Sequence, residues 1–119
     1  MYPIKDFMTT SILSVDSQTF VTEAAKLIST KKISSPLVKE GEVYVGIVTK
    51  TDFFKKLIAE DLDPKTTNIA FVMSKPFFLD ENVQRGEASE FMLRKKSKHL
   101  VVTHAKQVVG ILTTKDMVG

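Results

Sequence analysis

The sequence contains no cysteine and no tryptophan, and only five glycines and four prolines occur among its 119 residues. Without cysteine the chain can form no disulfide, no thiolate metal site and no cysteine nucleophile. No apolar run approaches the roughly 18 residues that cross a bilayer, and the charged start MYPIKDFM lacks the apolar stretch of a signal peptide. These absences predict a cytoplasmic protein that is not bound to a membrane.

Charge of one sign is also in small excess, because 17 lysines and arginines face 14 acidic residues and leave a net charge of +3. The basic residues gather in one short run, Arg94, Lys95, Lys96 and Lys98, while the aromatic residues lie mainly in apolar settings. Nucleic-acid binding favours basic and aromatic residues on one face, so this class is disfavoured. The length suits one compact domain with a single core.

What the sequence does contain is a repeated heptad. GIVTKTD occupies 46–52 and GILTTKD occupies 110–116, at an offset of 64. The same offset pairs identical residues further upstream, namely Asp16 with Asp80, Glu23 with Glu87, Ala24 with Ala88, Lys31 and Lys32 with Lys95 and Lys96, and Val38 with Val102. Met8 and Thr9 match Met73 and Ser74 at an offset of 65, so one residue has been lost between Ser74 and Asp80. The pattern predicts an internal duplication.

Each copy is expected to fold in the order strand, helix, strand, strand, helix. Apolar residues at helical spacing predict a helix over about 21–32, and Ala88, Phe91 and Met92 give an equivalent face in the second copy. Strands are predicted at 36–39, 43–49, 100–103 and 107–113, with turns at 40–42 and 104–106.

The segment after the first heptad predicts another helix. Phe53, Leu57 and Ile58 have helical spacing, and Asp63-Pro64 is expected to end that helix. Asn68 is expected to cap a short helix through Val72. The predicted organisation is repeat 1 with an N-terminal lead-in at 1–60, a connector at 61–67, and repeat 2 at 68–119 with its final helix truncated.

The heptad has two compatible interpretations. As structure, Thr49 is an N-cap and Asp52 closes a capping box, while Gly46 and Gly110 are points where the strand bends or another backbone approaches. As a site, a helix N-terminus with a threonine hydroxyl suits a phosphate. A carboxylate one turn further on can accept two hydrogen bonds from a ribose diol.

Longer segments around the two heptads carry a family resemblance. The first copy reads IKDFMTTSILSVDSQTFVTEAAKLI, then SPLVKEGEVYVGIVTKTDF; the second reads IAFVMSKPFFLDENVQRGEASEFML, then KHLVVTHAKQVVGILTTKDM. Both copies resemble the CBS (cystathionine-β-synthase) domain, over about 4–118. The resemblance implies an α/β fold of two tandem CBS repeats, each β-α-β-β-α, packed with pseudo-twofold symmetry, and pairing into a homodimer.

The resemblance also implies a ligand and its contacts. CBS pairs often bind adenosyl ligands such as AMP, ADP, ATP, S-adenosylmethionine or NAD in clefts between the two copies. Matching positions imply ribose contacts from Asp52 and Asp116, and phosphate or ribose contacts from Thr49 and Thr113. The adenine positions it implies are Ile12 and Val38 in one cleft, and Phe77 and Val102 in the other.

The two copies differ at the start of a central strand. The second copy has Lys98 and His99, where nucleotide-binding CBS domains often place basic residues, and the first has Ser34 and Ser35. A phosphate favours the basic site, so a phosphorylated ligand is expected at Asp116. The second copy also departs from the family with Leu100 in place of proline, and with Thr103-His104-Ala105 in place of a glycine-containing turn.

No catalytic constellation is present. His99 and His104 lack further ligands at zinc spacing, no GxxxxGK loop occurs, and paired carboxylates read as turn or helix-end residues. The chain is therefore expected to be a regulatory nucleotide sensor with no obligatory cofactor, acting on an effector in a longer parent chain. Two alternatives stay open: a ligand-free scaffold for dimerisation or docking, and a nucleic-acid binder using the basic run with Lys31 and Lys32.

Overall fold

The computed structural model describes residues 2–31 and 35–117. The chain forms two compact units: unit 1 comprises Met1–Ile12 and Pro76–Gly119, and unit 2 comprises Leu13–Lys75. Each unit has its own cluster of buried apolar residues. The expectation of a single core is therefore wrong, because each copy of the repeat buries its own helix and strand faces.

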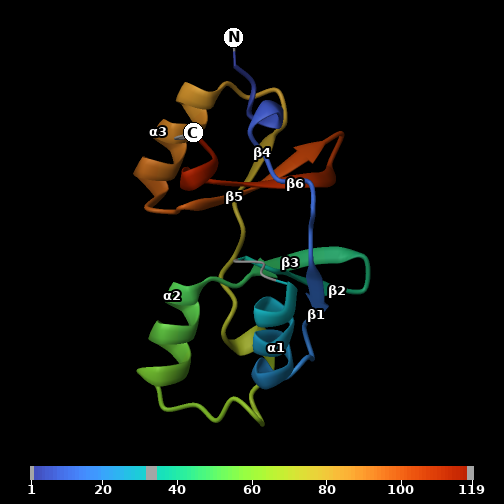
Figure 1. The fold of residues 1–119 in the computed structure, drawn as a ribbon, viewed down its shortest axis with the longest axis vertical. Helices are drawn as coiled ribbons and strands as arrows, with labels where there is room; N and C mark the ends of the chain where they lie inside the picture. The colour runs from blue at the N-terminus through green and yellow to red at the C-terminus, as the bar shows by residue number, and fades with distance from the viewer. Residues whose placement is uncertain (1, 32–34, 118–119) are drawn as a thin grey trace. The chain divides into compact units, whose positions relative to one another are not determined.

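Unit 2 contains the first copy of the repeat (Figure 1). Its strands are β1 (Ser14–Asp16), β2 (Leu37–Glu40) and β3 (Val43–Ile47), and α1 spans Val21–Lys31. β1 pairs with β2 in parallel, and β2 pairs with β3 antiparallel. The predicted order of elements is confirmed; the last residue predicted for the helix, Lys32, lies outside the described residues.

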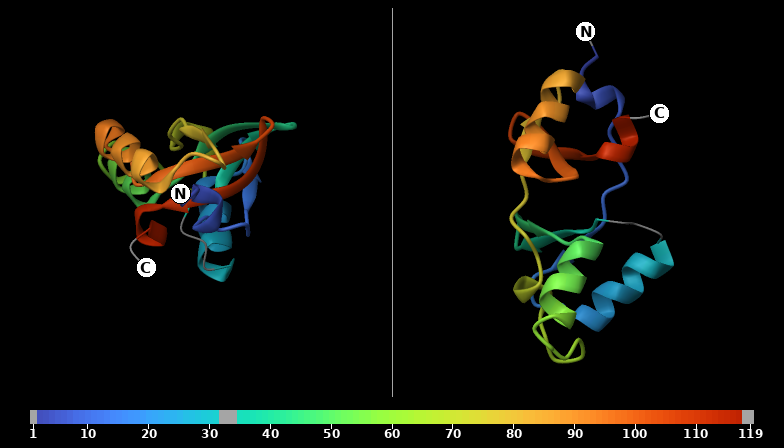
Figure 2. Two further views of the ribbon diagram at one scale, coloured as in Figure 1. Left: turned by 90° about the horizontal axis from the view of Figure 1, so that it is seen from above. Right: turned by 90° about the vertical axis from the view of Figure 1, so that its left-hand side faces the viewer.

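The helix after the first heptad differs from its prediction. It begins as α2 (Lys50–Asp52) and continues as η2 (Phe53–Ile58), which winds as a π-helix. Asp61 has a φ of 53°, outside the helical range, so the helix stops before the predicted Asp63-Pro64 stop. Figure 2 shows this helix beside α1, and residues of both contribute to the core of unit 2.

A short 3₁₀-helix, η3 (Ile69–Phe71), follows Asn68. Asn68 occupies the N-cap position, but its side chain makes no capping hydrogen bond. Its Nδ2 donates instead to Oε1 of Gln18 at 3.0 Å. The predicted cap is thus correct in position, but the side-chain hydrogen bond that would make Asn68 a cap is not formed.

Unit 1 contains the second copy and the N-terminal lead-in. Its elements are η1 (Ile4–Asp6), β4 (Phe78–Asp80), α3 (Arg85–Lys95), β5 (His99–His104), β6 (Gln107–Thr113) and η4 (Thr114–Met117). The sheet order β4-β5-β6 and its pairing directions repeat those of unit 2. Both sheets carry an irregularity at the same point, between Val38 and Lys39 and between Val102 and Thr103.

The lead-in is built into unit 1. Ile4 is fully buried in its core, and the Ile4 N–H donates to the Val83 carbonyl at 2.8 Å. Thr9 pairs antiparallel with Ile111 in β6. In unit 2, Ser74 pairs with Ile47 of β3 in the same way, which agrees with the offset of 65 that matches Thr9 to Ser74.

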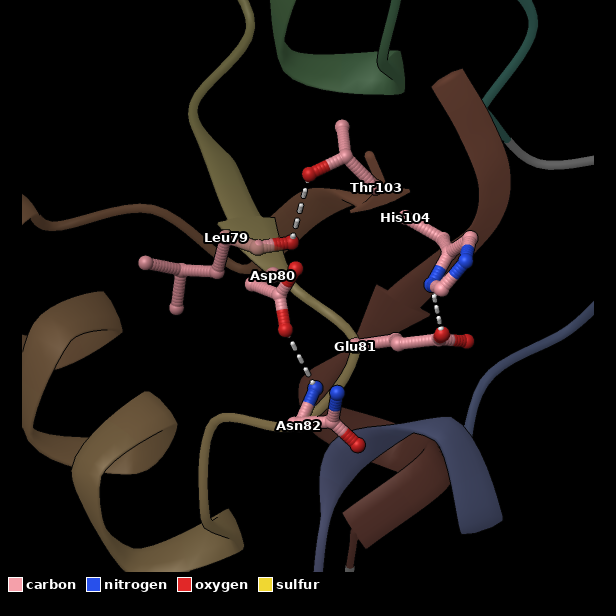
Figure 3. A network of polar contacts seen from close by, with 6 residues as sticks. All are labelled: Leu79, Asp80, Glu81, Asn82, Thr103 and His104. Atoms are coloured by element: carbon pink, nitrogen blue, oxygen red, sulfur yellow. Dashed lines mark hydrogen bonds and ion pairs between the residues drawn. The ribbon is translucent and has the colours of Figure 1, made fainter. Parts of the chain in front are cut away.

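The second hairpin turns at Ala105 and Lys106, whose φ angles are 48° and 68°. Nδ1 of His104 in β5 contacts the carboxylate of Glu81 and so links the hairpin to the segment after β4 (Figure 3). Asp80 accepts a hydrogen bond from the backbone of Asn82 at 2.9 Å. Both predicted hairpin turns are confirmed. None of the helices in the described ranges is long and apolar enough to span a membrane.

Candidate functional site

The corner between β3 and α2 carries the first predicted pair. Thr49 caps the helix, and Asp52 closes a capping box with it, as the sequence predicted. Oδ2 of Asp52 accepts hydrogen bonds from the Thr49 backbone N–H at 2.9 Å and the Thr49 hydroxyl at 3.2 Å. The Asp52 N–H in turn donates to Oγ1 of Thr49 at 3.3 Å.

The second oxygen of Asp52 is also engaged. The hydroxyl of Ser74 donates to Oδ1 at 2.5 Å, and Asp52 is 7% exposed. Both carboxylate oxygens of Asp52 therefore accept hydrogen bonds from groups of the chain itself. Sequence reasoning matched Ser74 to Thr9 but assigned it no role, because the two partners lie 22 residues apart.

The corner between β6 and η4 carries the second pair in a more open form. The Thr113 backbone N–H donates to Oδ2 of Asp116 at 2.9 Å. Within the described ranges, Oδ1 of Asp116 and the hydroxyl of Thr113 make no hydrogen bond. Both residues are half-buried. Unit 1 thus presents a carboxylate oxygen and a hydroxyl that unit 2 keeps occupied.

The basic pair predicted for phosphate lies next to this corner. His99 is the register partner of Thr113, and the Thr114 N–H donates to the Lys98 carbonyl at 3.1 Å. Lys98 is exposed and His99 is half-buried. The structure therefore brings Lys98, His99, Thr113 and Asp116 together at one end of the sheet of unit 1.

The corresponding serines of the first copy offer no comparable charge. Ser35 is buried, and Ser34 lies outside the described residues. Lys32, needed for the alternative basic surface, also lies outside them.

The predicted adenine contacts belong mainly to the cores. Val38 and Val102 are fully buried, so in this conformation their side chains present no surface to a ligand. Phe77 is half-buried and packs edge to face on Phe91, with ring centroids 5.7 Å apart. Ile12 belongs to unit 1, whereas its predicted partner Val38 belongs to unit 2.

The heptad glycines permit close packing of the preceding segments. A Cβ at Gly110 would lie 2.9 Å from the Thr9 carbonyl oxygen, and one at Gly46 would lie 2.2 Å from Sδ of Met73. The predicted approach of another backbone is confirmed at Gly110, whereas the atoms nearest to Gly46 belong to the Met73 side chain. Each glycine thereby holds Thr9 or Ser74 beside its own strand-to-helix corner.

Unit 1 also has a hollow of about 560 Å³ between α3 and η4. Its apolar lining includes Met92, Leu93 and Met117, with Lys98 at the rim. Thr113 and Asp116 are not among its described lining residues. Met117 is the repeat counterpart of Phe53, which packs against the core of unit 2, so this hollow belongs to the helix side of the unit.

In the described ranges, no group of three or more histidine, cysteine, aspartate or glutamate side chains could hold a metal ion. His104, which the sequence raised as a metal ligand, instead faces Glu81.

Two α/β units with the same strand order and the same Thr-x-x-Asp corner define a tandem-repeat module. The family model of the CBS domain matches residues 4–59 and 68–119, and the chain belongs to this family. The predicted fold class, α/β with two tandem CBS repeats, is confirmed. As a CBS pair, the chain falls among regulatory and signal-transduction modules.

Relatives and solved structures agree with this assignment. The chain is 32% identical over 120 residues to YlbB of Bacillus subtilis, a match that covers 98% of this chain and 80% of that protein. It is 27% identical over 111 residues to CBSCBSPB1 of Arabidopsis thaliana; that match covers 92% of this chain, and the chain spans only 20% of that protein's length.

Two solved structures share the fold. A signal-transduction protein with CBS domains from Burkholderia ambifaria superposes with a TM-score of 0.86 at 27% identity, covering 92% of this chain and 81% of that one. CBSX2, solved in complex with AMP, superposes with a TM-score of 0.81 at 23% identity, covering 99% and 94% of the two chains.

Proposed function

We propose that the chain is a regulatory module that binds an adenosine-containing nucleotide, such as AMP, ADP, ATP, S-adenosylmethionine or NAD, at the corner of unit 1. The observation that carries the proposal is the contrast between the two corners. Asp116 keeps one carboxylate oxygen available, and Thr113 keeps its hydroxyl available. The corresponding groups of Asp52 and Thr49 are occupied by the chain.

The chemistry of the corner suits a nucleoside phosphate. A carboxylate accepts hydrogen bonds from a ribose diol, which assigns this role to Asp116. The Thr113 hydroxyl donates to a phosphate oxygen, and the ammonium group of Lys98 adds a charge-assisted contact. A phosphorylated ligand is therefore favoured over an uncharged nucleoside. The fully buried Val102 leaves the adenine contacts to more accessible groups such as Phe77.

Binding becomes a signal when the two conformations of a module have different affinities for the ligand. A protein of the same fold, CBSX2, holds AMP, which makes AMP the first ligand to test here. Relatives in which this chain spans only 20% of the length support an effector in a longer protein. We also propose that the chain forms a homodimer and that it acts in the cytoplasm.

The test is a thermal-shift panel of AMP, ADP, ATP, S-adenosylmethionine and NAD, with AMP and 2′-deoxy-AMP compared directly. A ligand at about 100 times its dissociation constant stabilises the folded state by about 2.7 kcal/mol. We expect at least one ligand to give such a gain, Asp116→Ala to abolish it, and 2′-deoxy-AMP to give less than AMP.

Asp80→Ala is the matched control. Asp80 also belongs to unit 1 and also accepts a backbone hydrogen bond through its carboxylate, but it is exposed and lies at the end of β4. Its variant should keep the full gain. Equal gains in the wild type and Asp116→Ala would reject the assigned site.

A scaffold for dimerisation or docking is the second candidate. Phe54 and Ile58 lie one turn apart on η2 and are 70% and 65% exposed, and the Asp52 corner is occupied. Exposed apolar residues grouped on one helix mark interaction surfaces. No stabilisation by any nucleotide in the panel would favour this function over ligand sensing.

A further inference from the structure

One difference between the two corners is a hydroxyl from outside the heptad that meets the carboxylate of Asp52. Oδ1 of Asp52 accepts from Ser74 at 2.5 Å, whereas Oδ1 of Asp116 accepts no hydrogen bond within the described ranges. A distance of 2.5 Å falls among short, charge-assisted O–H···O⁻ contacts. Ser74 thus gives Asp52 the type of contact that a ribose hydroxyl would give.

Ser74 is held at this position from its backbone. It exchanges two hydrogen bonds with Ile47, both 2.9 Å long. The carbonyl of the preceding residue, Met73, accepts from Nζ of Lys56 on η2 at 2.8 Å, and the Met73 side chain packs over Gly46. The hydroxyl is therefore fixed beside the carboxylate by contacts that do not depend on it.

Thr9 occupies the counterpart position in unit 1. It exchanges hydrogen bonds of 2.8 and 2.9 Å with Ile111, the repeat counterpart of Ile47. Its hydroxyl makes no hydrogen bond within the part of the chain that the structure describes. The two segments have the same backbone pairing, so the side chain at this position, and not the path of the chain, distinguishes the corners.

We propose that Ser74 is a specificity-determining residue that closes the Asp52 corner by standing in for a ligand hydroxyl, so that the pair binds one nucleotide, at unit 1. This inference rests on the proposed function of the Asp116 corner. A tethered group acts at a high effective concentration, so a free nucleotide must displace the Ser74 hydroxyl to reach Asp52. Without that hydroxyl, Oδ1 of Asp52 becomes an unsatisfied acceptor of the kind that Asp116 presents.

The experiment is isothermal titration of the full chain with AMP, in the wild type, Asp116→Ala and the double variant Ser74→Ala/Asp116→Ala. We expect one AMP per wild-type chain and at least a tenfold loss of affinity in Asp116→Ala. The double variant should regain at least tenfold, through Asp52. Adding Asp52→Ala to the double variant should remove this binding again.

Matched variants test whether the Ser74 hydroxyl itself closes the Asp52 corner. Thr9→Ala/Asp116→Ala removes the counterpart hydroxyl and should stay as weak as Asp116→Ala. Ser74→Thr gives unit 2 the side chain found at the open corner of unit 1, so it should open the Asp52 corner as Ser74→Ala does. Ser74→Gly is a further opening variant if the alanine variant does not fold.

The outcomes distinguish the inference from the function on which it rests. If the wild type binds one AMP and the affinity lost in Asp116→Ala does not recover when Ser74 is also removed, the inference is overturned and the nucleotide function stands. Two equal AMP sites in the wild type have the same consequence. Binding that appears only after Ser74 is removed supports closure of the Asp52 corner by Ser74 and rejects binding at Asp116. Absence of AMP binding in every variant overturns both.

Discussion

At the scale of single residues, Asp52 and Asp116 occupy the same position of the repeated heptad but differ in how many hydrogen bonds they accept. Asp52 accepts three hydrogen bonds and is 7% exposed. Asp116 accepts one from the residues that the structure describes and is half-buried. A residue that its own chain satisfies supports the fold first, whereas one with an unused oxygen is available to a ligand.

This difference predicts unequal effects on stability. Asp52→Ala should lower the free energy of unfolding by about 3 kcal/mol, since it removes three hydrogen bonds of about 1 kcal/mol each. Asp116→Ala should lower it by about 1 kcal/mol, the usual effect of losing a helix-terminal cap. Urea unfolding without ligand measures both, and equal losses would contradict the hydrogen-bond assignment.

Local contacts explain which parts of the site could be predicted from the sequence. Thr49 and Asp52 are three residues apart, so their capping box follows from spacing on a helix. The bond between Ser74 and Asp52 could not be predicted, because it depends on the pairing of the Met73–Ser74 segment with β3. The burial of Val38 and Val102 could not be predicted either, because apolar strand residues look alike in sequence whether they contact a ligand or the core.

At the scale of secondary-structure elements, the strands, α1, α3 and both hairpin turns could be predicted from hydrophobic periodicity and turn residues. The π-helical winding of η2 could not, because the apolar spacing of Phe53, Leu57 and Ile58 also suits an α-helix. Both hairpins have a left-handed residue at the same repeat position: Gly41 has a φ of 60°, and its counterpart Ala105 has a φ of 48°.

The left-handed conformation of Ala105 predicts a stabilising substitution. Residues with a Cβ are disfavoured there by about 1–2 kcal/mol, whereas glycine adopts it freely. Ala105→Gly should therefore raise the free energy of unfolding by about 0.5–1 kcal/mol. The reciprocal Gly41→Ala should lower it by about 1 kcal/mol, because its Cβ would meet no atom within 4 Å and only the backbone is strained. Chemical denaturation of both variants checks the pair, and a shift of the same sign in each would count against this explanation.

At the scale of the whole molecule, the sequence repeats and the compact units are different stretches of chain. The family matches run over 4–59 and 68–119, whereas unit 1 joins residues from both matches. The duplication could be predicted from the constant offset. The placement of the lead-in could not, since Ile4 carries no signal that tells which of two similar cores it enters.

The location of Ile4 predicts a localised effect of Ile4→Ala. Truncating a fully buried isoleucine costs about 3 kcal/mol, and the loss should fall on unit 1. Hydrogen exchange should show about a hundredfold loss of protection in β5 and β6, with smaller changes in β2 and β3. Val15→Ala, a change in the core of unit 2, should give the opposite distribution. Uniform loss throughout the chain in either variant would indicate one cooperative core.

The division of unit 1 into two separated segments also has a consequence for biosynthesis. A ribosome produces residues 2–12 first, yet their partners in β6 are made about a hundred residues later. Unit 2, which is continuous in sequence, is complete well before that point and can fold during elongation. Residues 2–12 pair with residues 81–85 as well as with β6, so this segment cannot complete its pairing until translation has passed β6, and unit 2 can assemble before unit 1.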